Sequence, residues 1–411
     1  MRRAVTVVAL CAGTAFSQSF LPLGDLPGGA DLSTATGVSA DGLVVVGLSR
    51  SGSGNEAFRW TAGEGMIGLG DFAGGVFRSA ALGISGDGAT TVGTGYDAGG
   101  VTAFRWTSAD GLLTLAPFPE PEILESSAAG ASADAGVIVG SYTTPLGHRA
   151  FGWTPDLGAF WLGKLESGFE ASVGFAVSAD GSVLVGGAET STGWHPFRWT
   201  SDLGMVSLGD LPGGSGGGYA RGISADAQFI VGLANNAQGR EEAFVWSDDE
   251  GMVGLGALGT GDSGAWAVGG PLPTVVGTCV DGRGASLPTE AFIWTPDDGI
   301  RSLRQLLIDS GVTGLEAWLL TEARGISADG LVVVGSGINP QGNAEAWLVQ
   351  LPGPEECIPD FNGDGNLDFF DVQRFLNLFS AGDLDADLND DGQLNFFDVQ
   401  RYLNLFSAGC P

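Results

Sequence analysis

The stretch Ser39-Ala-Asp-Gly-Leu-Val-Val-Val-Gly47, followed after nine residues by Ala57-Phe-Arg-Trp60, contains the pattern that organises most of this 411-residue chain. Tryptophans in the register of Trp60 return at positions 106, 153, 199, 246 and 294, at spacings of 46 to 48 residues. The Val-Gly pair recurs seven times, with its glycine at positions 47, 93, 140, 186, 232, 277 and 335. Self-similarity at a fixed period is the signature of a repeat architecture, so we count seven units.

Each unit contains four short runs of β-type sequence. In the first copy they cover residues 35–39, 43–48, 57–61 and 66–72. Asp41-Gly42 lies between the first two runs and predicts a hairpin, because glycine tolerates the positive φ of a tight turn. Phe58 and Trp60 are two positions apart and therefore share one face of a strand. Four strands in about 46 residues is the repeat length of a β-propeller blade.

The two ends of the array predict a closed ring. Residues 21–26 match the fourth strand of a unit, with their closest copy at 208–211, yet they precede the first unit. The seventh unit stops after its third strand, near Leu351. Seven complete blades form only if the N-terminal strand joins the last one, which pairs both open edges. We therefore expect an all-β, seven-bladed propeller of four-stranded blades over residues 18–351, and prefer it to an open β-helix.

Composition and the first residues narrow the function classes. The chain has 71 Gly without a collagen period, two His and a formal net charge of −31. Such an acidic protein repels phosphate, which argues against nucleic acid and anionic lipid as primary partners. Residues 1–17 have a basic head, an apolar stretch and a small-x-small end, the pattern of an export signal. We expect a secreted chain, extracellular or at the cell surface, with no transmembrane segment after cleavage.

The repeat motifs resemble those of the bacterial extracellular HAF repeat family. The resemblance is carried by Gly-Asp-Leu-Pro-Gly-Gly at 24–29 and 209–214, by Ser-Ala-Asp-Gly and by Ala-Phe-Arg-Trp, and it covers about residues 20–351. It implies an extracellular location and a repeat architecture, and it implies no reaction.

The residues of the repeat are explained mainly by structure. The regular tryptophans are expected to pack between adjacent blades, Ser-Ala-Asp-Gly to form hairpin turns, and Val-Gly to permit crowding near the ring axis. Few residues are suited to catalysis. The chain has only two histidines, His148 and His195, so a catalytic Ser-His pair is not expected, although pairs of carboxylates stay possible. Cys279 is expected to be a buried thiol.

Trp161, Trp194, Trp266 and Trp318 fall outside the regular register and are the best candidates for ligand contacts. Recognition is expected in the loops between second and third strands, at 49–55, 97–100, 190–195 and 279–289.

After a linker at 352–356, a second duplication appears with a period of 27 residues. Each copy places oxygen-bearing residues in the order of an EF-hand calcium loop, which predicts two bound Ca²⁺ ions. The expected ligands are Asp360, Asn362, Asp364, Asn366, Asp368 and Asp371 in the first loop, and Asp387, Asn389, Asp391, Gln393, Asn395 and Asp398 in the second. Helical patterns follow at 368–379 and 395–406, and neither loop is preceded by an apolar entering helix.

This duplication, residues 357–411, resembles a type I dockerin of the GC-type. The resemblance implies a small α-helical calcium-binding domain, a Cys357–Cys410 disulfide and attachment to a cohesin-like or other surface-anchoring protein. Positions 10 and 11 of the loops depart from the family. They hold Phe369, Phe370, Phe396 and Phe397 where cellulosomal dockerins carry polar recognition residues. These side chains are either core or a different partner face.

These features together favour a non-enzymatic binding or structural propeller, tethered to a cell surface or extracellular assembly by a calcium-dependent module. A glycan or protein ligand is possible at the propeller loops. The alternative is a polysaccharide-active enzyme or lectin, by analogy with dockerin-bearing carbohydrate-degrading systems.

Overall fold

The computed structural model describes residues 18–116, 118, 122–166, 168–280, 289–352, 359–362, 366–388 and 392–408. These residues form two compact units, one up to Leu351 and one from Pro352 onward. The proposed signal at 1–17 and the two cysteines Cys357 and Cys410 lie outside the described residues.

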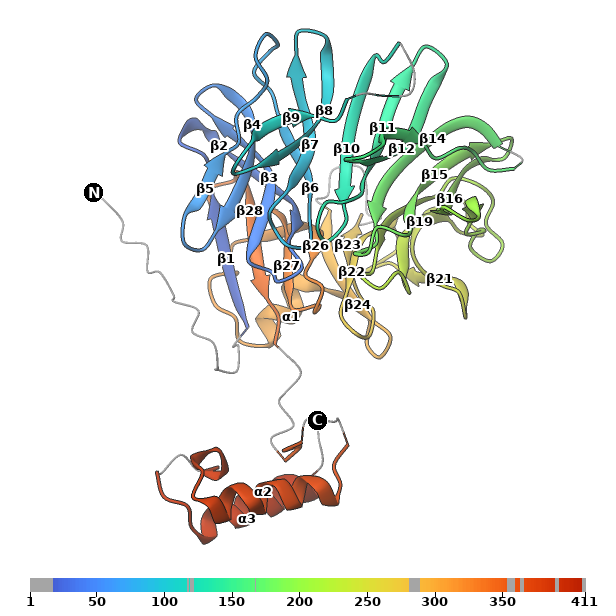
Figure 1. The fold of residues 1–411 in the computed structure, drawn as a ribbon. Coiled ribbons are helices and arrows are strands. Elements are labelled where there is room, and N and C mark those ends of the chain that lie inside the picture. The colour runs from blue at the N-terminus through green and yellow to red at the C-terminus, as the bar shows by residue number, and fades with distance from the viewer. Residues whose placement is uncertain are drawn as a thin grey trace. The chain divides into compact units, whose positions relative to one another are not determined.

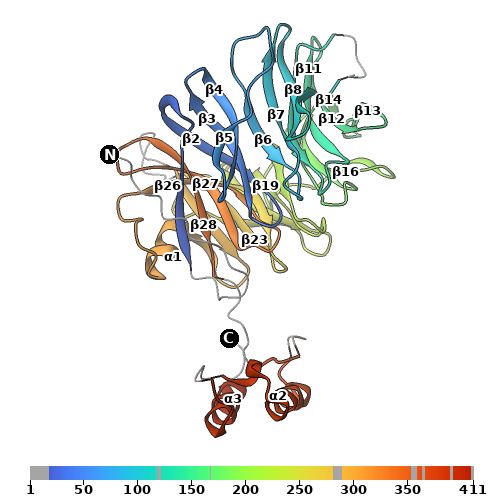
Figure 2. The same cartoon turned by 60° about the vertical axis from the view of Figure 1, so that its left-hand side comes forward.

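The first unit consists of seven four-stranded antiparallel sheets arranged as the blades of a propeller (Figures 1 and 2). In blades 1 to 6 the strands are hydrogen-bonded in chain order with the first strand innermost, whereas the outermost strand of blade 7 is the first strand of the chain. Blades 1 to 3 contain β2 (Gly28–Val38), β3 (Val44–Ser51), β4 (Gly54–Thr61) and β5 (Gly65–Gly68); β6 (Ala80–Ile84), β7 (Thr91–Asp97), β8 (Gly100–Thr107) and β9 (Gly111–Thr114); and β10 (Glu125–Ala131), β11 (Ile138–Thr144), β12 (Gly147–Thr154) and β13 (Gly158–Trp161). Blades 4 and 5 contain β14 (Gly168–Val177), β15 (Leu184–Thr190), β16 (Gly193–Thr200) and β17 (Gly204–Ser207); and β18 (Tyr219–Ile223), β19 (Ile230–Asn235), β20 (Glu241–Ser247) and β21 (Gly251–Gly256). Blades 6 and 7 contain β22 (Ser263–Gly269), β23 (Thr274–Cys279), β24 (Glu290–Thr295) and β25 (Gly299–Ser302); and β26 (Leu319–Ile326), β27 (Val332–Ile338), β28 (Ala344–Gln350) and β1 (Ser19–Gly24).

The N-terminal strand completes the seventh blade. β1 pairs antiparallel with β28, from Ser19 opposite Gln350 to Gly24 opposite Ala346. The prediction of a seven-bladed ring closed by its first strand is therefore confirmed. The limits of individual strands were less accurate: the fourth strand of blade 1, expected over 66–72, ends at Gly68. Beyond it, the Leu69 N–H still donates to the Ala57 carbonyl before the chain leaves for the next blade.

Hydrophobic clusters fill the seven interfaces between neighbouring blades. Phe58 and Trp60 of blade 1, for example, pack with Val332 and Val334 of blade 7. Trp153 and Phe151 of blade 3 pack in the same way with Val92 of blade 2. The prediction that the repeated aromatic residues pack between blades is confirmed, and it explains why one face of the third strand is aromatic in blades 1 to 6.

A buried serine near the start of the first strand links blades through the main chain. Its hydroxyl accepts a hydrogen bond from the alanine N–H on the third strand of the preceding blade. The pairs and N–O distances are Ala57–Ser79 (3.0 Å), Ala103–Ser126 (2.9 Å), Ala150–Ser172 (3.1 Å), Ala243–Ser263 (2.9 Å) and Ala346–Ser33 (3.0 Å). Blade 4 has Pro196 at the alanine position, which has no N–H, and the following blade has Gly218 in place of the serine. Where the donor is missing, the acceptor is missing too.

The glycine of each Val-Gly pair is required inside its own blade. A Cβ on Gly47 would lie 2.0 Å from the Thr34 carbonyl oxygen and 2.8 Å from the Phe58 ring. The corresponding Cβ on Gly140 would lie 2.0 Å from the Ser127 carbonyl oxygen and 2.8 Å from the Phe151 ring. The explanation by crowding at the ring axis was wrong, because the close neighbours are the first strand and the third-strand aromatic ring of the same sheet.

The Ser-Ala-Asp-Gly motifs form hairpin turns, as predicted. The Ser39 hydroxyl donates to Asp41 Oδ1 (2.5 Å) and accepts from the Val44 N–H (2.9 Å). The same serine–aspartate contact recurs at Ser178 and Asp180. Neighbouring turns are joined through the main chain, for example from the Ala40 N–H to the Gly86 carbonyl (2.9 Å).

The remaining helices are short. α1 (Leu303–Asp309) lies between blades 6 and 7 in the chain and buries Leu303 and Leu307 in their shared core. The second unit contains α2 (Phe369–Ala381), the 3-10 helix η1 (Leu384–Ala386) and α3 (Phe396–Ala408). α2 and α3 lie side by side (Figure 2), and Phe375 stacks on its repeat equivalent Tyr402 at 4.1 Å between ring centroids. No helix in the described ranges is long and apolar enough to cross a membrane.

Candidate functional site

The innermost strand of every blade contains a β-bulge at the same place. Its pairing with the second strand shifts across a single residue, such as Thr36 between Ala35 and Gly37, or Arg221 between Ala220 and Gly222. A bulge leaves one residue without a partner in the ladder and turns its side chain to a new direction. The bulged residues of blades 1 to 7 are Thr36, Leu82, Ala129, Phe175, Arg221, Trp266 and Arg324.

All seven bulged residues line one cavity in the centre of the ring, with a volume of about 450 Å³. This volume lies within the range of small-molecule sites in proteins. Blades 1 to 3 contribute the smaller side chains Thr36, Leu82 and Ala129. Blades 4 to 7 contribute two aromatic rings and two guanidinium groups. The repeat is therefore symmetric in its backbone and asymmetric in the side chains that face the cavity.

The four large side chains form an alternating stack of aromatic and cationic groups. The Arg221 guanidinium lies 4.0 Å from the centre of the Phe175 ring and 5.3 Å from the centre of the Trp266 ring. Arg324 lies 4.1 Å from the same Trp266 ring, whose Nε1–H donates to Thr278 Oγ1 (2.9 Å). Aromatic faces attract guanidinium groups, so these contacts fix the position of both cations.

The two arginines differ in their anionic partners. Arg324 Nε donates to Glu322 Oε2 at 2.7 Å, within an ion pair. The Arg221 Nε–H is buried and has no hydrogen-bond acceptor in the described part of the chain. Burial is the main cause that lowers the pKa of the Arg221 guanidinium; Tyr219 and Glu241 partly oppose this effect, and the charge of Arg324 adds to it. Arg221 is therefore a cation that the protein itself leaves poorly compensated.

The predicted ligand residues compare with this site as follows. Trp266, one of the four tryptophans predicted to contact a ligand, lines the cavity. Trp318 is 4% exposed and packs against Phe20, and is therefore core. Trp194 packs against Tyr219 with the two rings tilted, and Trp161 lies beside Arg149.

The other cavity residues were missed because the expectation was placed on the loops between second and third strands. The sequence does contain a signal, a frame of small residues around one variable position. Ala35-Thr-Gly, Ala81-Leu-Gly, Ala220-Arg-Gly and Ala323-Arg-Gly show it most clearly.

His195 forms a chain of polar contacts near blade 4. Its Nδ1 lies 3.1 Å from Asp210 Oδ1, and its Nε2 lies 2.9 Å from Thr192 Oγ1. This order resembles a nucleophile, base and orienting acid. The N–H groups around it are already used, since Thr192 N donates to Thr190 Oγ1 and Gly217 N donates to the Trp194 carbonyl. These N–H groups are not free to stabilise an oxyanion, so the contacts order the loop.

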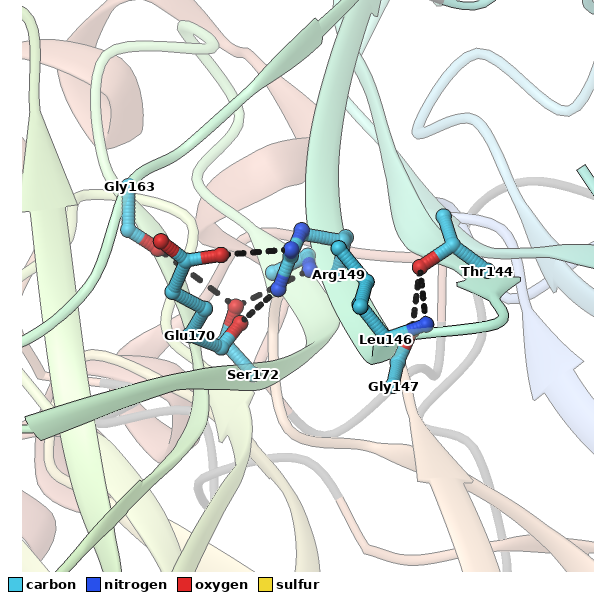
Figure 3. A network of polar contacts seen from close by, with 8 residues as sticks. Thr144, Leu146, Gly147, Arg149, Gly163, Glu170 and Ser172 are labelled. Atoms are coloured by element: carbon cyan, nitrogen blue, oxygen red, sulfur yellow. Dashed lines mark hydrogen bonds and ion pairs between the residues drawn. The ribbon is translucent and has the colours of Figure 1, made fainter. Parts of the chain in front are cut away.

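Arg149 forms a buried polar network between blades 3 and 4 (Figure 3). Its Nη2 donates to Glu170 Oε2 at 2.6 Å, and its Nη1 donates to the Glu170 carbonyl at 2.7 Å. The Arg149 side chain is 4% exposed and that of Glu170 is 52% exposed. This cation has its own anion, which makes it a structural contact between blades.

Cys279 is a buried thiol, as expected. It is 2% exposed and accepts a hydrogen bond from the Leu258 N–H (3.4 Å). Burial raises the pKa of the Cys279 thiol to about 11. At neutral pH the group is protonated and is not an activated nucleophile.

The second unit brings some of the predicted calcium ligands together. Asp371, at position 12 of the first loop, is fully buried and accepts hydrogen bonds from the N–H groups of Asn362 (3.1 Å) and Asp368 (2.9 Å). The side chain of Asp360, at position 1, also contacts that of Asp371. Burial raises the pKa of the Asp371 carboxyl, but the hydrogen bonds outweigh this effect and bring the pKa below its ordinary value.

The second loop repeats this arrangement. Asp398 is also fully buried and accepts from the Asn395 N–H (2.8 Å), and Asp387 Oδ2 accepts from the Gly392 N–H (2.7 Å). Two buried carboxylates at the junction of loop and helix fit a calcium-binding role, because hard oxygen ligands are what Ca²⁺ requires. Asp364, Asn389 and Asp391 lie outside the described residues, and among the residues that are described no group of three or more acids, histidines or cysteines is assembled.

The four phenylalanines at positions 10 and 11 of the loops are exposed. Phe369 and Phe396 are each 70% exposed, and Phe370 and Phe397 are 62% and 64% exposed. The core of the unit is formed instead by Phe375, Ala386 and Tyr402. Of the two interpretations of these phenylalanines, the core role is wrong.

Comparison with known proteins finds solved structures of low similarity. No family model matches the sequence, and no curated protein matches it. Similar solved structures include the β-propeller domain of the trilobed protease from Pyrococcus furiosus, with 10% identity, TM-score 0.47, and coverage of 82% of this chain and 94% of that one. An oligogalacturonate lyase in complex with manganese has 11% identity, TM-score 0.48, and coverage of 84% and 99%. A putative TolB from Agrobacterium tumefaciens has 14% identity, TM-score 0.43, and coverage of 70% and 94%. At these values the likeness carries no argument about ligands or reactions.

Proposed function

We propose that this protein is an exported, non-enzymatic binding propeller whose C-terminal dockerin-like module, folded around two Ca²⁺ ions, attaches it to a cell-surface or extracellular assembly. The observation that carries the attachment role is the repeated burial of Asp371 and Asp398. Each of these carboxylates accepts main-chain N–H bonds and keeps further lone pairs for a cation. Like charges such as Asp360 and Asp371 repel unless a cation or a proton lies between them. A bound divalent ion supports both contacts at once.

The exposed phenylalanines support a docking role for the same module. Phe369 and Phe370 precede the body of α2 in the way that Phe396 and Phe397 precede that of α3. Exposed apolar clusters are the usual mark of a protein interaction surface. The partner we propose is a cohesin-like or other anchoring protein with an apolar recognition surface, because polar recognition residues are missing at these positions.

Calcium titration of the full-length protein tests the first part. We expect two ions to bind, and the thermal transition of the C-terminal unit to move to higher temperature with calcium. Asp371→Asn and Asp398→Asn should each abolish one site, whereas Asp385→Asn, a change in η1 outside the predicted ligand set, should leave both. Binding of no calcium, or equal binding by all three variants, would overturn the metal assignment.

Docking is tested by capture of surface proteins from the source cells, with wild type and a Phe369→Ser/Phe370→Ser variant. We expect a calcium-dependent partner that the variant loses and that a Leu384→Ser variant, altered at another exposed apolar residue, retains. Equal capture by the two variants would refute the phenylalanine surface. Release of reducing sugar from polysaccharides by the full-length protein would refute the non-enzymatic part and favour the carbohydrate-active alternative.

A further inference from the structure

The central cavity has the properties of a ligand site and not of packing alone. In blades 1 to 3 the bulge carries small side chains, which leaves space opposite the stack formed by blades 4 to 7. A ring of propeller blades encloses a central channel whatever its lining, so the space alone does not indicate a ligand. The informative feature is that two fixed guanidinium groups face this cavity of about 450 Å³.

The chemistry of the cavity selects for negative charge. Arg221 and Arg324 lie close to the same Trp266 ring, and Glu322 is the carboxylate paired with Arg324. Placing two arginines near each other is unfavourable unless an anion lies between or beside them. In a chain with 48 acidic and 17 basic residues, this local excess of cations runs against the overall charge.

The aromatic groups define what part of a ligand is recognised. Arg221 covers the Phe175 ring at 4.0 Å, and Arg324 covers the Trp266 ring at 4.1 Å. Because these ring faces already hold the guanidinium groups, the stack offers N–H donors to the cavity in preference to a platform for a sugar ring. A guanidinium fork matches two oxygens of one carboxylate or phosphate group.

We infer that the central cavity binds a small molecule through an oxyanion, carboxylate or phosphate, held by Arg221 and Arg324. The inference deepens the proposed function by naming the class of ligand for the propeller. It does not depend on calcium-dependent attachment, since the two sites lie in different units.

The affinity test uses the full-length protein in an oxyanion-free buffer, with inorganic phosphate, glucuronate and glucose as probes. Glucose is the neutral control for glucuronate, because it lacks the carboxylate. Comparing phosphate with glucuronate shows which of the two oxyanions the site prefers. Titration is followed by tryptophan fluorescence, to which Trp266 contributes, and by calorimetry, before and after calcium is removed on a chelating resin. We expect saturable binding of at least one oxyanion and none of glucose. Unchanged binding by the calcium-free protein would locate the site away from the C-terminal module.

Arg221→Met should weaken oxyanion binding by about tenfold or more, because it removes charged hydrogen bonds to the ligand. The matched control is Arg198→Met, which removes an arginine that also lies over a tryptophan ring, Trp246 at 5.0 Å, but outside the cavity. That variant should bind as the wild type does. Failure of every oxyanion to bind, or equal binding by both variants, would overturn the inference.

A stability measurement separates a binding role from a packing role. Without ligand, Arg221→Met should leave the melting temperature unchanged or raise it, because it removes a partly buried cation whose Nε–H has no acceptor among the described residues. If Arg221 served only to hold the stack together, the variant would unfold at a lower temperature, and that result would contradict a site built for a ligand.

Discussion

The serine bridges between blades make a sharp prediction about stability. Ser126→Ala removes the acceptor for the Ala103 N–H, which lies 2.9 Å from Ser126 Oγ. Ala103 is completely buried and Ser126 is 4% exposed, so water does not replace the lost oxygen. A buried N–H left without a partner costs about 1 to 3 kcal/mol, which is the expected loss in the free energy of unfolding.

Ser127→Ala is the matched control, because the two serines are adjacent on β10 and lose the same atom. Ser127 is only half-buried, and we expect its substitution to change the free energy of unfolding by no more than about 0.5 kcal/mol. Urea unfolding followed by tryptophan fluorescence, with calcium present throughout, measures both variants. Gly218→Ser gives a second comparison: it should not stabilise the protein, since Pro196 offers no N–H and the new side chain would crowd the Leu233 carbonyl.

The reasoning fails if Ser126→Ala and Ser127→Ala unfold at the same urea concentration. It also fails if Gly218→Ser raises the midpoint, because the absence of a donor at Pro196 would then be irrelevant to the choice of residue at position 218.

Three further outcomes are expected. Gly140→Ala should destabilise the protein by about 3 kcal/mol or more in thermal unfolding, because the new Cβ would lie 2.0 Å from the Ser127 carbonyl oxygen. Gly63→Ala is the control: its Cβ would meet no atom within 4 Å, so it should be neutral in the same experiment. Glu170→Ala should lower the free energy of unfolding by about 1 to 3 kcal/mol, because it removes the carboxylate that pairs with the buried Arg149 guanidinium. Glu64→Ala, in the exposed pair with Arg59, should lower it by less than about 1 kcal/mol. Equal losses would show that burial of the pair does not matter. Cys279, with a pKa of about 11 in the folded state, should resist alkylation at pH 8, should react faster as the pH approaches 11, and should react readily in urea. In a Cys357→Ser/Cys410→Ser background, rapid labelling of the folded protein at pH 8 would contradict this.

Much of the fold follows from the sequence because the repeat is explicit. The seven Val-Gly pairs predict the number of blades, and the fourth-strand sequence at 21–26, which precedes the first unit, predicts how the ring closes. Strand ends are harder to predict, since Leu69 continues the hydrogen bonding of β5 without belonging to it. The role of the Val-Gly glycine depends on a carbonyl and a ring brought together by pairing, as at Thr34 and Phe58, and spacing alone does not show this contact.

The cavity was harder to foresee for a physical reason. A bulge changes the direction of one side chain in a strand whose neighbours keep the usual alternation, so periodicity assigns Arg221 and Arg324 no special face. Trp266 was singled out by its irregular register, but nothing in the register indicates that Phe175, Arg221 and Arg324 meet it. In the second unit the prediction depends on less, since the predicted ligands of each calcium loop lie within one segment of the chain and are assigned by their order in sequence.

The closure of the ring by β1 also determines the order in which the chain folds. The Gly24 N–H donates to Glu345 Oε1 across 321 positions of sequence, so this contact forms only after nearly the whole propeller has been made. Each of the other blades pairs strands that are close in sequence, and these pairings are faster because their loops are short. β28 therefore presents an open edge late in folding, and any β1 strand matches it, including that of another molecule. Refolding at high protein concentration should then divide between closed monomers and strand-exchanged oligomers, and the outermost strand of blade 7 should be the last to acquire protection from hydrogen exchange.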